Sequence, residues 1–534
     1  MAIANVNKSI LTPVEFLTRS AFVYPNKLAV VYKDQRYTYK QFSERVYRLA
    51  NALKAKGVGK GDKVAFICPN IPPMLEAHYA VPMIGAALVS VNIRLSKGEV
   101  SYIVDHSDAK LLVVDSELAA TVDPRELSKV KTYVTICDID KNITIHGSLE
   151  YEAFLAEASP VAPPTDIDSE DQLIAINYTS GTTGRPKGVM YHHRGAYLNA
   201  IGEILESGVT PASVYLWTLP MFHCNGWCFT WGITAAGATH VCLRAVIAED
   251  IYRLIQEENV THLCAAPTIL IIMSSWPGAA DMKIKQPLKI MTAGAPPAPT
   301  IISNMEKIGA EITHTYGLTE VYGPHSVCAW QPTWKDLSAA ELADVKSRQG
   351  VPYIVTHYMD VVDPITMEPV PRDGLTIGEI VMRGNNVMTG YYKDPKATEA
   401  AFAGGWFHSG DLAVMHEDGY VQIMDRKKDI IISGGENIST VEVENVIYRH
   451  PAVQEVAVIP VPDDKWGEVP KAFIILKPNA SATAEDIITF TKEHLARFKA
   501  PKYIEFSDLP KTATGKIQKF KLREKEWEGR RRVN

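Results

Sequence analysis

Helix-like and strand-like segments alternate through most of the chain, and this alternation limits the folds that it can adopt. Residues 39–56 carry apolar side chains at helical spacing and end at Gly57, while residues 63–68 have the pattern of a short buried strand. Such alternation is typical of α/β architecture with largely parallel sheets. Because 534 residues exceed what one hydrophobic core usually supports, we expect at least two domains.

A charged run at residues 425–429, Asp-Arg-Lys-Lys-Asp, is the sharpest candidate for a domain boundary. It separates two strand-like runs, residues 419–424 and 430–433, and the chain beyond it is long enough for a small α+β domain. On composition alone, a charged turn inside one domain fits equally well.

Composition excludes several classes of function. The net charge of −6 argues against a nucleic-acid-binding protein, because such proteins carry an excess of basic residues. Seven scattered cysteines without a CxxC pair predict a reducing compartment, and the N-terminus does not resemble a secretory signal, so cytoplasm is the expected location. The apolar stretch 74–95 is interrupted by Glu76, His78 and Pro82, which predicts a buried helix followed by a strand and no membrane span.

A loop rich in glycine and hydroxyl groups comes directly after the apolar segment 173–177. Glycines let backbone N–H groups surround an anion, hydroxyls add donors, and lysine adds positive charge. The loop is not a Walker A motif, because Pro186 stands where that pattern needs glycine. A surface loop without a ligand remains the alternative to a phosphate site. Its polar and glycine residues are Thr179, Ser180, Gly181, Thr182, Thr183, Gly184, Lys187 and Gly188.

The ordered string from Tyr178 to Gly188 closely resembles the AMP-binding signature of the adenylate-forming superfamily, which includes acyl-CoA synthetases, aryl-CoA ligases, luciferases and peptide-synthetase adenylation domains. The resemblance extends from about Phe16 to Lys519. It implies a large N-terminal domain of α/β subdomains with a β-barrel-like part at residues 1–425. A hinge at residues 426–428 and a small mobile α+β C-terminal domain at residues 429–534 would come after it.

Three further motifs resemble the nucleotide site of the family: Thr-Ala-Gly-Ala-Pro-Pro at 292–297, His-Thr-Tyr-Gly-Leu-Thr-Glu at 314–320 and Trp-Phe-His-Ser-Gly-Asp at 406–411. The resemblance implies that Tyr316 lies against adenine, that Asp411 accepts the ribose hydroxyls and that Glu320 with Thr179 holds Mg²⁺. The implied ATP and AMP contacts are Thr179, Ser180, Gly181, Thr182, Thr183, Lys187, Gly294, Ala295, Pro296, Thr315, Tyr316, Gly317, Asp411 and Arg426.

The C-terminal part resembles the family's mobile domain. Pro-Lys-Thr-Ala-Thr-Gly-Lys at 510–516 matches the catalytic lysine motif, and Lys428 falls at the hinge position. Residues 433–436 resemble the loop that lines the coenzyme A tunnel. The implied catalytic residues are Lys516, Glu320, Thr319 and His223, and the implied coenzyme A contacts are Ser433, Gly434, Gly435 and Glu436.

The acyl pocket rests on fewer residues. In the segment 220–227, His223 stands where amino-acid-activating relatives carry aspartate, which disfavours an amino-acid substrate. Gly317 occupies the place of a bulky indole in acetate-specific relatives, so more than two carbons should fit. Trp227, Tyr322 and Trp231 could cap the cavity or could be core aromatics. The implied pocket residues are His223, Cys224, Asn225, Trp227, Gly317 and Tyr322.

The resemblance therefore implies an ATP-dependent acyl-CoA ligase with ATP, Mg²⁺ and coenzyme A. Its substrate would be a short- to medium-chain acid, branched or methylthio acids included. Within the family, the string His-Cys-Asn-Gly-Trp is most similar to medium-chain acyl-CoA synthetases and the 3-(methylthio)propanoate ligase. An aryl-CoA ligase, a ligase that loads a carrier protein, and a regulatory nucleotide-binding protein are the alternatives. The expected partners are these small molecules and a second copy in a homodimer, with no nucleic acid and no membrane span.

Overall fold

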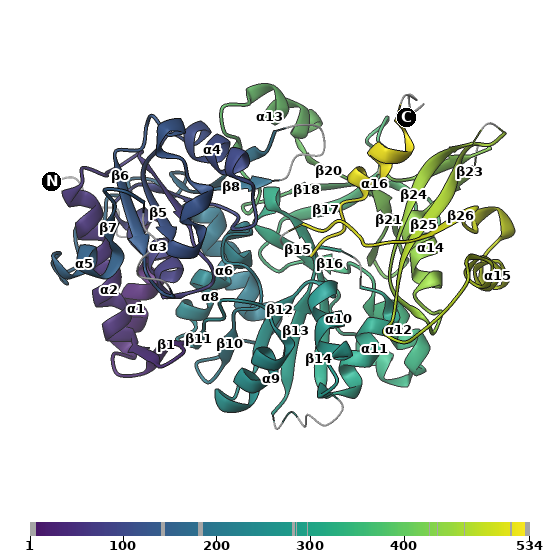
Figure 1. The fold of residues 1–534 in the computed structure, drawn as a ribbon, viewed down its shortest axis with the longest axis horizontal. Coiled ribbons are helices and arrows are strands. Elements are labelled where there is room, and N and C mark those ends of the chain that lie inside the picture. Colours follow the sequence, from purple (N-terminus) through teal and green to yellow (C-terminus); the bar gives the residue numbers. More distant parts are fainter. Residues whose placement is uncertain are drawn as a thin grey trace.

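The computed structural model describes most of the chain. Its strands form four sheets (Figure 1). The described residues are 7–139, 145–179, 185–279, 284, 286–295, 297–426, 428–434, 436–463, 465–512 and 515–528. Of the residues named above, Ser180, Gly181, Thr182, Thr183, Gly184, Pro296 and Gly435 lie outside them.

An eight-stranded sheet carries the predicted phosphate loop. Its centre is parallel, and the antiparallel pair β8–β9 lies toward one edge. The predicted strand at 63–68 is confirmed as β3. In sheet order the strands are β19 (Gly390–Tyr391), β9 (Lys187–His192), β8 (Leu173–Thr179), β4 (Ala87–Ser90), β3 (Lys63–Ile67), β5 (Ala109–Asp115), β6 (Thr132–Ile136) and β7 (Leu149–Glu150).

A nine-stranded sheet carries two of the predicted nucleotide motifs at the ends of β13 and β14. These two strands are parallel neighbours, so the residues that come after them meet at one edge of the sheet. In sheet order the strands are β16 (Val351–Pro352), β15 (Gly323–Val327), β14 (Ala310–Leu318), β13 (Leu288–Thr292), β12 (His262–Ala265), β10 (Val214–Leu216), β11 (Thr239–Val241), β1 (Leu28–Tyr32) and β2 (Gln35–Thr38).

A four-stranded antiparallel sheet comes next along the chain, and its last strand ends at the charged run 425–429. A bridge between Gly350 and Val421 joins this sheet to the end of the nine-stranded one. This sheet lies where the resemblance implies a β-barrel-like part, and its barrel-like character stays a prediction. Its strands are β17 (Tyr358–Val362), β18 (Gly378–Arg383), β20 (Phe407–Met415) and β21 (Val421–Arg426).

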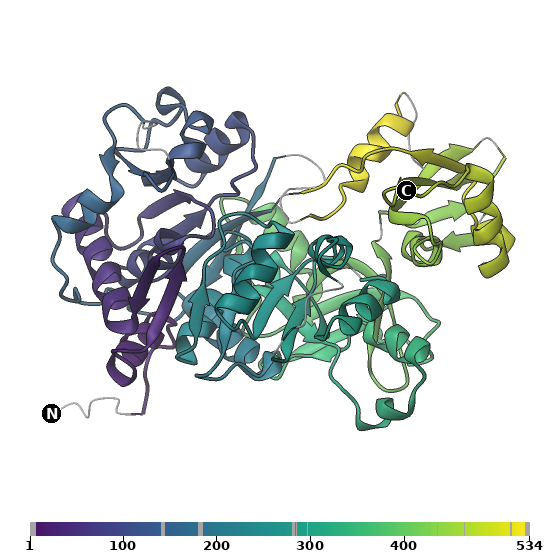
Figure 2. The same cartoon turned by 60° about the horizontal axis from the view of Figure 1, so that its bottom comes forward.

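The C-terminal residues form a small α+β unit with its own apolar clusters. Figure 2 shows it set apart from the large unit, with its last segment (yellow) reaching back toward the centre of the molecule. The predicted α/β fold with a small α+β domain is confirmed. The unit contains β22 (Ile431–Ser433), β23 (Glu436–Ile438), β24 (Val453–Asp463), β25 (Gly467–Leu476), β26 (Tyr503–Phe506), α14 (Thr440–Ile447), α15 (Ala484–His494) and α16 (Lys519–Glu526).

Helices cover the sheets of the large unit, and the predicted helix at 39–56 is confirmed with a Thr38 capping box at its start. They are α1 (Val14–Val23), α2 (Tyr39–Ala55), α3 (Pro72–Met83), α4 (Lys97–His106), α5 (Tyr151–Ala156), α6 (His193–Ser207), α7 (Cys224–Trp227), α8 (Phe229–Ala235), α9 (Ala248–Glu257), α10 (Pro267–Ser275), α11 (Pro299–Lys307), α12 (Ala339–Lys346) and α13 (Pro395–Ala401).

The apolar stretch 74–95 forms a buried helix, α3, followed by β4, as predicted. Glu76 is fully buried on α3, and its carboxylate pairs with Arg45 at 2.6 Å and accepts a hydrogen bond from the Tyr151 hydroxyl at 2.6 Å. These partners offset the cost of burying the charge. Within the described residues, no helix combines the length and apolarity that crossing a membrane requires.

The backbone at residues 224–228 is in the left-handed conformation. All five residues have positive φ, between 43° and 63°, although only Gly226 is a glycine. This left-handed conformation costs roughly 1–2 kcal/mol per non-glycine residue. Asn225 offsets part of that cost because its buried side chain accepts a hydrogen bond from Asn177 Nδ2 at 2.6 Å and bonds His78 Nε2 at 2.9 Å.

We predict that Asn225→Ala destabilises the fold more than Asn225→Gly does. Both variants remove the partner of Asn177 Nδ2 and of His78 Nε2, at a cost of about 1–3 kcal/mol for each buried group. Alanine adds the strain of a left-handed residue, about 1–2 kcal/mol. Urea denaturation would measure the difference in unfolding free energy.

Asn479→Ala is the matched control, because Asn479 is also left-handed, with φ at 62°, but is exposed. Its free energy of unfolding should fall only by the strain of a left-handed alanine. Equal stability of Asn225→Ala and Asn479→Ala would contradict the importance of the buried hydrogen bonds.

Candidate functional site

The predicted phosphate loop is the tip of the β8–β9 hairpin. Thr179 and Lys187 are paired at its two ends, and the loop residues between them that the sequence singles out lie outside the described part of the chain. Helix α4 anchors the hairpin, because His106 Nδ1 hydrogen-bonds the Tyr178 hydroxyl at 2.8 Å and the Tyr102 hydroxyl donates to Pro186 O at 3.3 Å. The hairpin is therefore tied to the large unit on both sides of its tip.

Lys187 and Glu320, predicted from separate motifs, meet through Tyr391. The Lys187 ammonium lies 4.7 Å from the centre of the Tyr391 ring, and the Tyr391 hydroxyl donates to Glu320 Oε1 at 2.9 Å. Burial raises the pKa of Glu320, while Tyr391, Arg426 and Lys187 oppose that rise. A carboxylate oriented in this way, close to the phosphate hairpin, suits a hard cation held together with phosphate oxygens. Tyr391 lies in none of the sequence motifs.

Asp411 binds two other predicted residues at once. Its Oδ2 accepts a hydrogen bond from the Tyr316 hydroxyl at 2.7 Å, and its Oδ1 lies 3.2 Å from Arg426 Nε. Asp411 and Arg426 face each other across the β20–β21 ladder, and Asp411 is only 4% exposed. Because a carboxylate offers about four acceptor positions, Asp411 can still accept two further hydroxyl donors.

The predicted adenine turn comes directly after β13, beside the end of β14. Gly294 has φ at 93° and is exposed, so the turn offers backbone to a planar ligand. The Thr315 hydroxyl donates to Thr292 O at 3.4 Å and ties the two strand ends together. Ala295 and Tyr316 therefore lie at the same sheet edge as Gly294.

Lys516 comes from the small unit and lies near the Asp411 pair. Burial lowers the pKa of Lys516 to about 7; Arg426 and Lys428 lower it further, and Asp411 opposes them. Burial also lowers the pKa of His223 to about 4, with Lys516 as the second cause. Residues from the C-terminal end of the chain and from its middle thus share one electrostatic environment. Lys428 itself has a pKa lowered to about 8, first by burial.

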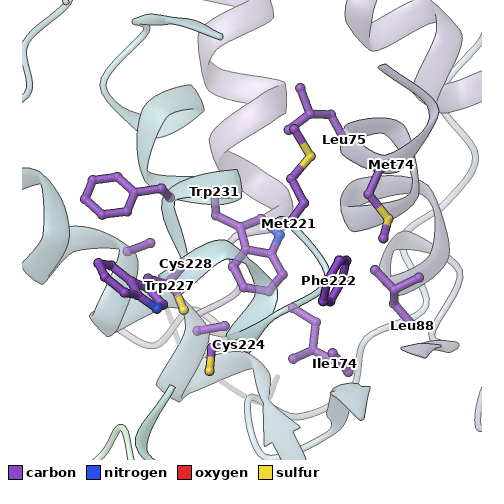
Figure 3. Close-up of a cluster of buried hydrophobic side chains, with 14 of the residues drawn as sticks. Met74, Leu75, Leu88, Ile174, Met221, Phe222, Cys224, Trp227, Cys228 and Trp231 are labelled. Atoms are coloured by element: carbon purple, nitrogen blue, oxygen red, sulfur yellow. The ribbon is translucent and has the colours of Figure 1, made fainter. Parts of the chain in front are cut away.

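The left-handed segment 224–228 connects the predicted acyl pocket to the nucleotide motif. The Cys224 thiol, whose pKa burial raises to about 12, donates to Thr319 Oγ1 at 3.4 Å. Trp227 lies directly on Gly323, where an added Cβ would be 2.9 Å from the indole Cδ1. Figure 3 shows Cys224, Trp227 and Trp231 within a cluster of buried apolar side chains that also contains Met74 and Phe222.

Three predicted pocket residues have packing functions in the structure. A Cβ at Gly317 would lie 1.7 Å from Gly323 O, so this glycine lets β14 and β15 approach each other. Tyr322 is fully buried, stacks on Tyr191 with ring centres 3.9 Å apart and accepts a hydrogen bond from His192 N–H. Asn225 is likewise fully buried. Their place at the acyl pocket stays a prediction.

The predicted coenzyme A loop is the β22–β23 hairpin of the small unit, where Ser433 pairs with Glu436. Gly434 has φ at 60°, and its N–H donates to Trp466 O at 2.8 Å. An added Cβ on Gly434 would lie 2.8 Å from the Trp466 ring, so the position has no room for a side chain.

Comparisons with known proteins identify the family of this chain. The model of the AMP-binding enzyme family matches residues 17–392, and the model of the AMP-binding enzyme C-terminal domain matches residues 442–516. The anthranilate CoA ligase AuaEII, solved with anthranoyl-AMP, has a TM-score of 0.87 and 26% identity, with 97% of each chain covered.

Several curated relatives are similar over nearly their whole length. The acetate–CoA ligase CCL3 of Humulus lupulus is 47% identical over 97% of this chain and 95% of its own. The peroxisomal acetate/butyrate–CoA ligase AAE7 of Arabidopsis thaliana is 46% identical over 97% and 95%. The 4-hydroxybutyrate–CoA ligase 2 of Metallosphaera sedula is 46% identical over 96% and 94%. This chain therefore belongs to the AMP-binding enzyme family.

Proposed function

We propose that the chain is an AMP-forming acid–thiol ligase that uses ATP and coenzyme A to convert a short-chain carboxylic acid into its acyl-CoA. The observation that carries this proposal is the position of Lys516, which the small unit presents to the Asp411–Arg426 pair. Curated relatives named for acetate, butyrate and 4-hydroxybutyrate, alike over nearly the whole chain, support the reaction class.

The reaction has two half-steps. In the first, a carboxylate oxygen attacks the α-phosphorus of ATP, the bond to pyrophosphate breaks, and an acyl-adenylate forms. In the second, the coenzyme A thiolate attacks the acyl carbon and AMP leaves with the electron pair. Because negative groups must approach each other in the first step, fixed positive charge and hydrogen-bond donors lower its barrier.

Each nucleotide residue has a proposed task. Tyr316, Gly294, Ala295 and Pro296 would hold adenine, and Asp411 would bind the ribose with Arg426. Lys187 and the hairpin tip, Ser180 to Thr183, would bind phosphate. Thr319 would contact the α-phosphate, to which Lys516 would bring its charge. Glu320, oriented by Tyr391, fits a magnesium ligand together with Thr179, and magnesium would neutralise phosphate charge when bound.

The second half-step needs the small domain in another arrangement. We propose domain bounds of 1–425 and 429–534 with a hinge at 426–428, since β21 ends the last sheet of the large unit and β22 begins that of the small one. Rotation at Lys428 would bring Ser433, Gly434, Gly435 and Glu436 to the acyl-adenylate. The narrow backbone at Gly434 suits passage of a pantetheine arm.

The acid is proposed to be small, from acetate to butyrate in size. Trp227, fixed against Gly323, and Trp231, whose indole N–H donates to His78 O at 3.0 Å, support a short pocket. His223 would border its entrance. A medium-chain or 3-(methylthio)propanoate substrate is the second candidate, on the string at 223–227. A cytoplasmic location and a homodimer stay predictions.

We predict that Lys516→Ala lowers acyl-adenylate formation at least about a hundredfold, because loss of one preorganised donor costs about 2.7–4 kcal/mol of barrier. Thioester formation from pre-made acyl-adenylate should change little. Pyrophosphate release and acyl-CoA formation would be measured separately, and equal losses in both half-reactions would refute this division of labour.

The pH dependence should report the lowered pKa of Lys516. Since the ammonium form predominates below pH 7, kcat/KM for ATP in the first half-step should fall as pH rises through about 7. Lys516→Arg keeps its charge at all these pH values, so any activity it retains should lack this fall. A wild-type profile that rises over the same interval would contradict a required ammonium group.

Substrate size is tested by kcat/KM for acetate, butyrate, 3-(methylthio)propanoate, hexanoate and benzoate with coenzyme A present. We expect butyrate to exceed hexanoate at least about tenfold, because methylene recognition in a closed pocket has this magnitude. Trp227→Leu should raise hexanoate relative to butyrate. A wild-type preference for benzoate would favour an aryl-CoA ligase instead, and acyl transfer only to a carrier protein would exclude coenzyme A as the acceptor.

A further inference from the structure

The loop that carries Lys516 is a closed turn. Lys511 and Ile517 form a bridge, Thr512 N–H donates to Lys516 O at 2.7 Å, and Lys516 N–H donates to Thr512 Oγ1 at 3.0 Å. Gly515 N–H donates to Thr512 O at 2.9 Å. Because the described residues of this turn bond to one another, a contact at Gly515 also positions Lys516.

One such contact comes from the large unit. The hydroxyl of Thr268, the second residue of α10, donates to Gly515 O at 2.7 Å. The approach is close, because a Cβ on Gly515 would lie 2.6 Å from Thr268 Oγ1, and Gly515 has φ at 83°. The bond crosses 247 residues of sequence and ends one residue before Lys516.

A second contact between the same units has a different character. Tyr448, at the end of α14, packs against the apolar cluster of the large unit that includes residues of α10 and α11. Apolar packing tolerates small displacements, whereas a hydrogen bond fixes a distance and a direction. Ser439 and Thr440 also donate hydrogen bonds to the large unit, but they do so at Met424 and Asp425, next to the proposed hinge. The Thr268 bond ends on the Lys516 turn itself, so Thr268 is suited to set the position of that turn.

We propose that Thr268 is a positioning residue that latches the Lys516 turn onto α10 during acyl-adenylate formation and releases it before thioester formation. This inference rests on the proposed function and names a residue that acts on one half-step alone. Release is required because the two half-steps use different parts of the small domain, the Lys516 turn and the Gly434 hairpin. The latch contributes to the first arrangement only.

The test compares the two half-reactions in Thr268→Val, which keeps the branched shape but removes the donor. We expect the rate of carboxylate-dependent pyrophosphate release to fall about tenfold, the usual size for one lost hydrogen bond. Thioester formation from pre-made acyl-adenylate should stay within about twofold of wild type. Thr268→Ser should keep a rate of pyrophosphate release close to that of the wild type, since it keeps the hydroxyl.

Ser274→Ala is the matched control on the same helix, because the Ser274 hydroxyl donates to Ile271 O within α10. It should leave both half-reactions unchanged. Gly515→Ala is the second variant, and it should show the same selective loss of the first half-reaction because its Cβ would push Thr268 away. Thermal denaturation of each variant checks that the fold is retained.

The outcomes separate the latch from the proposed function. If wild type releases no pyrophosphate with any acid, the proposed function fails and the latch with it. If wild type is active and Lys516→Ala impairs the first step, but Thr268→Val equals wild type or loses both half-reactions equally, the latch alone is refuted. A Thr268→Ser variant as slow in pyrophosphate release as Thr268→Val would also refute the latch.

Discussion

The site depends on one buried carboxylate. Asp411 joins Tyr316, at the end of a strand in the nine-stranded sheet, to Arg426, at the end of the four-stranded sheet. Because Asp411 is almost fully buried, both bonds are charge-assisted in surroundings of low dielectric constant and strengthen each other. Arg426 is also the last residue of β21, directly ahead of the proposed hinge. The same pair therefore fixes two sheets of the large unit and the starting point of the small one.

Electrostatics then links the small unit to this pair. A lysine ammonium brought into a site that already contains Arg426 loses solvation and gains a like-charged neighbour, which explains the lowered pKa of Lys516. The negative charge of a bound polyphosphate would raise the pKa of Lys516 again. In our account the energy of binding ATP offsets the cost of placing Lys516 there.

Much of this can be predicted from the sequence. Helix α2, strand β3 and the buried helix α3 are evident from local periodicity. The charged run near Asp425 is a local signal too, but composition alone fits a turn inside one domain equally well, and the domain bounds stay a proposal. The proposed nucleotide residues lie in short motifs, so a resemblance over a few residues is enough to name Lys187, Glu320, Asp411 and Lys516. The structure then brings these residues near one another.

The remainder depends on contacts between segments far apart in sequence. Tyr391 orients Glu320 across 71 residues, and Thr268 reaches Gly515 across 247. Neither has a local signal. The family resemblance implies that Gly317 marks pocket size, which stays a prediction; that Gly317 also allows the close approach of Gly323 has no local signal. The left-handed segment at 224–228 has no signal in the sequence because cysteine and tryptophan rarely adopt that conformation without tertiary support.

The most direct measurement is a crystal structure with a non-hydrolysable analogue of an acyl-adenylate. Our account predicts that Asp411 accepts both ribose hydroxyls, that Lys516 contacts the phosphate or an acyl oxygen, and that Thr268 still donates to Gly515. A nucleotide bound away from Asp411, or a Lys516 turned out of a site that holds the analogue with Thr268 still bonded to Gly515, would contradict the account.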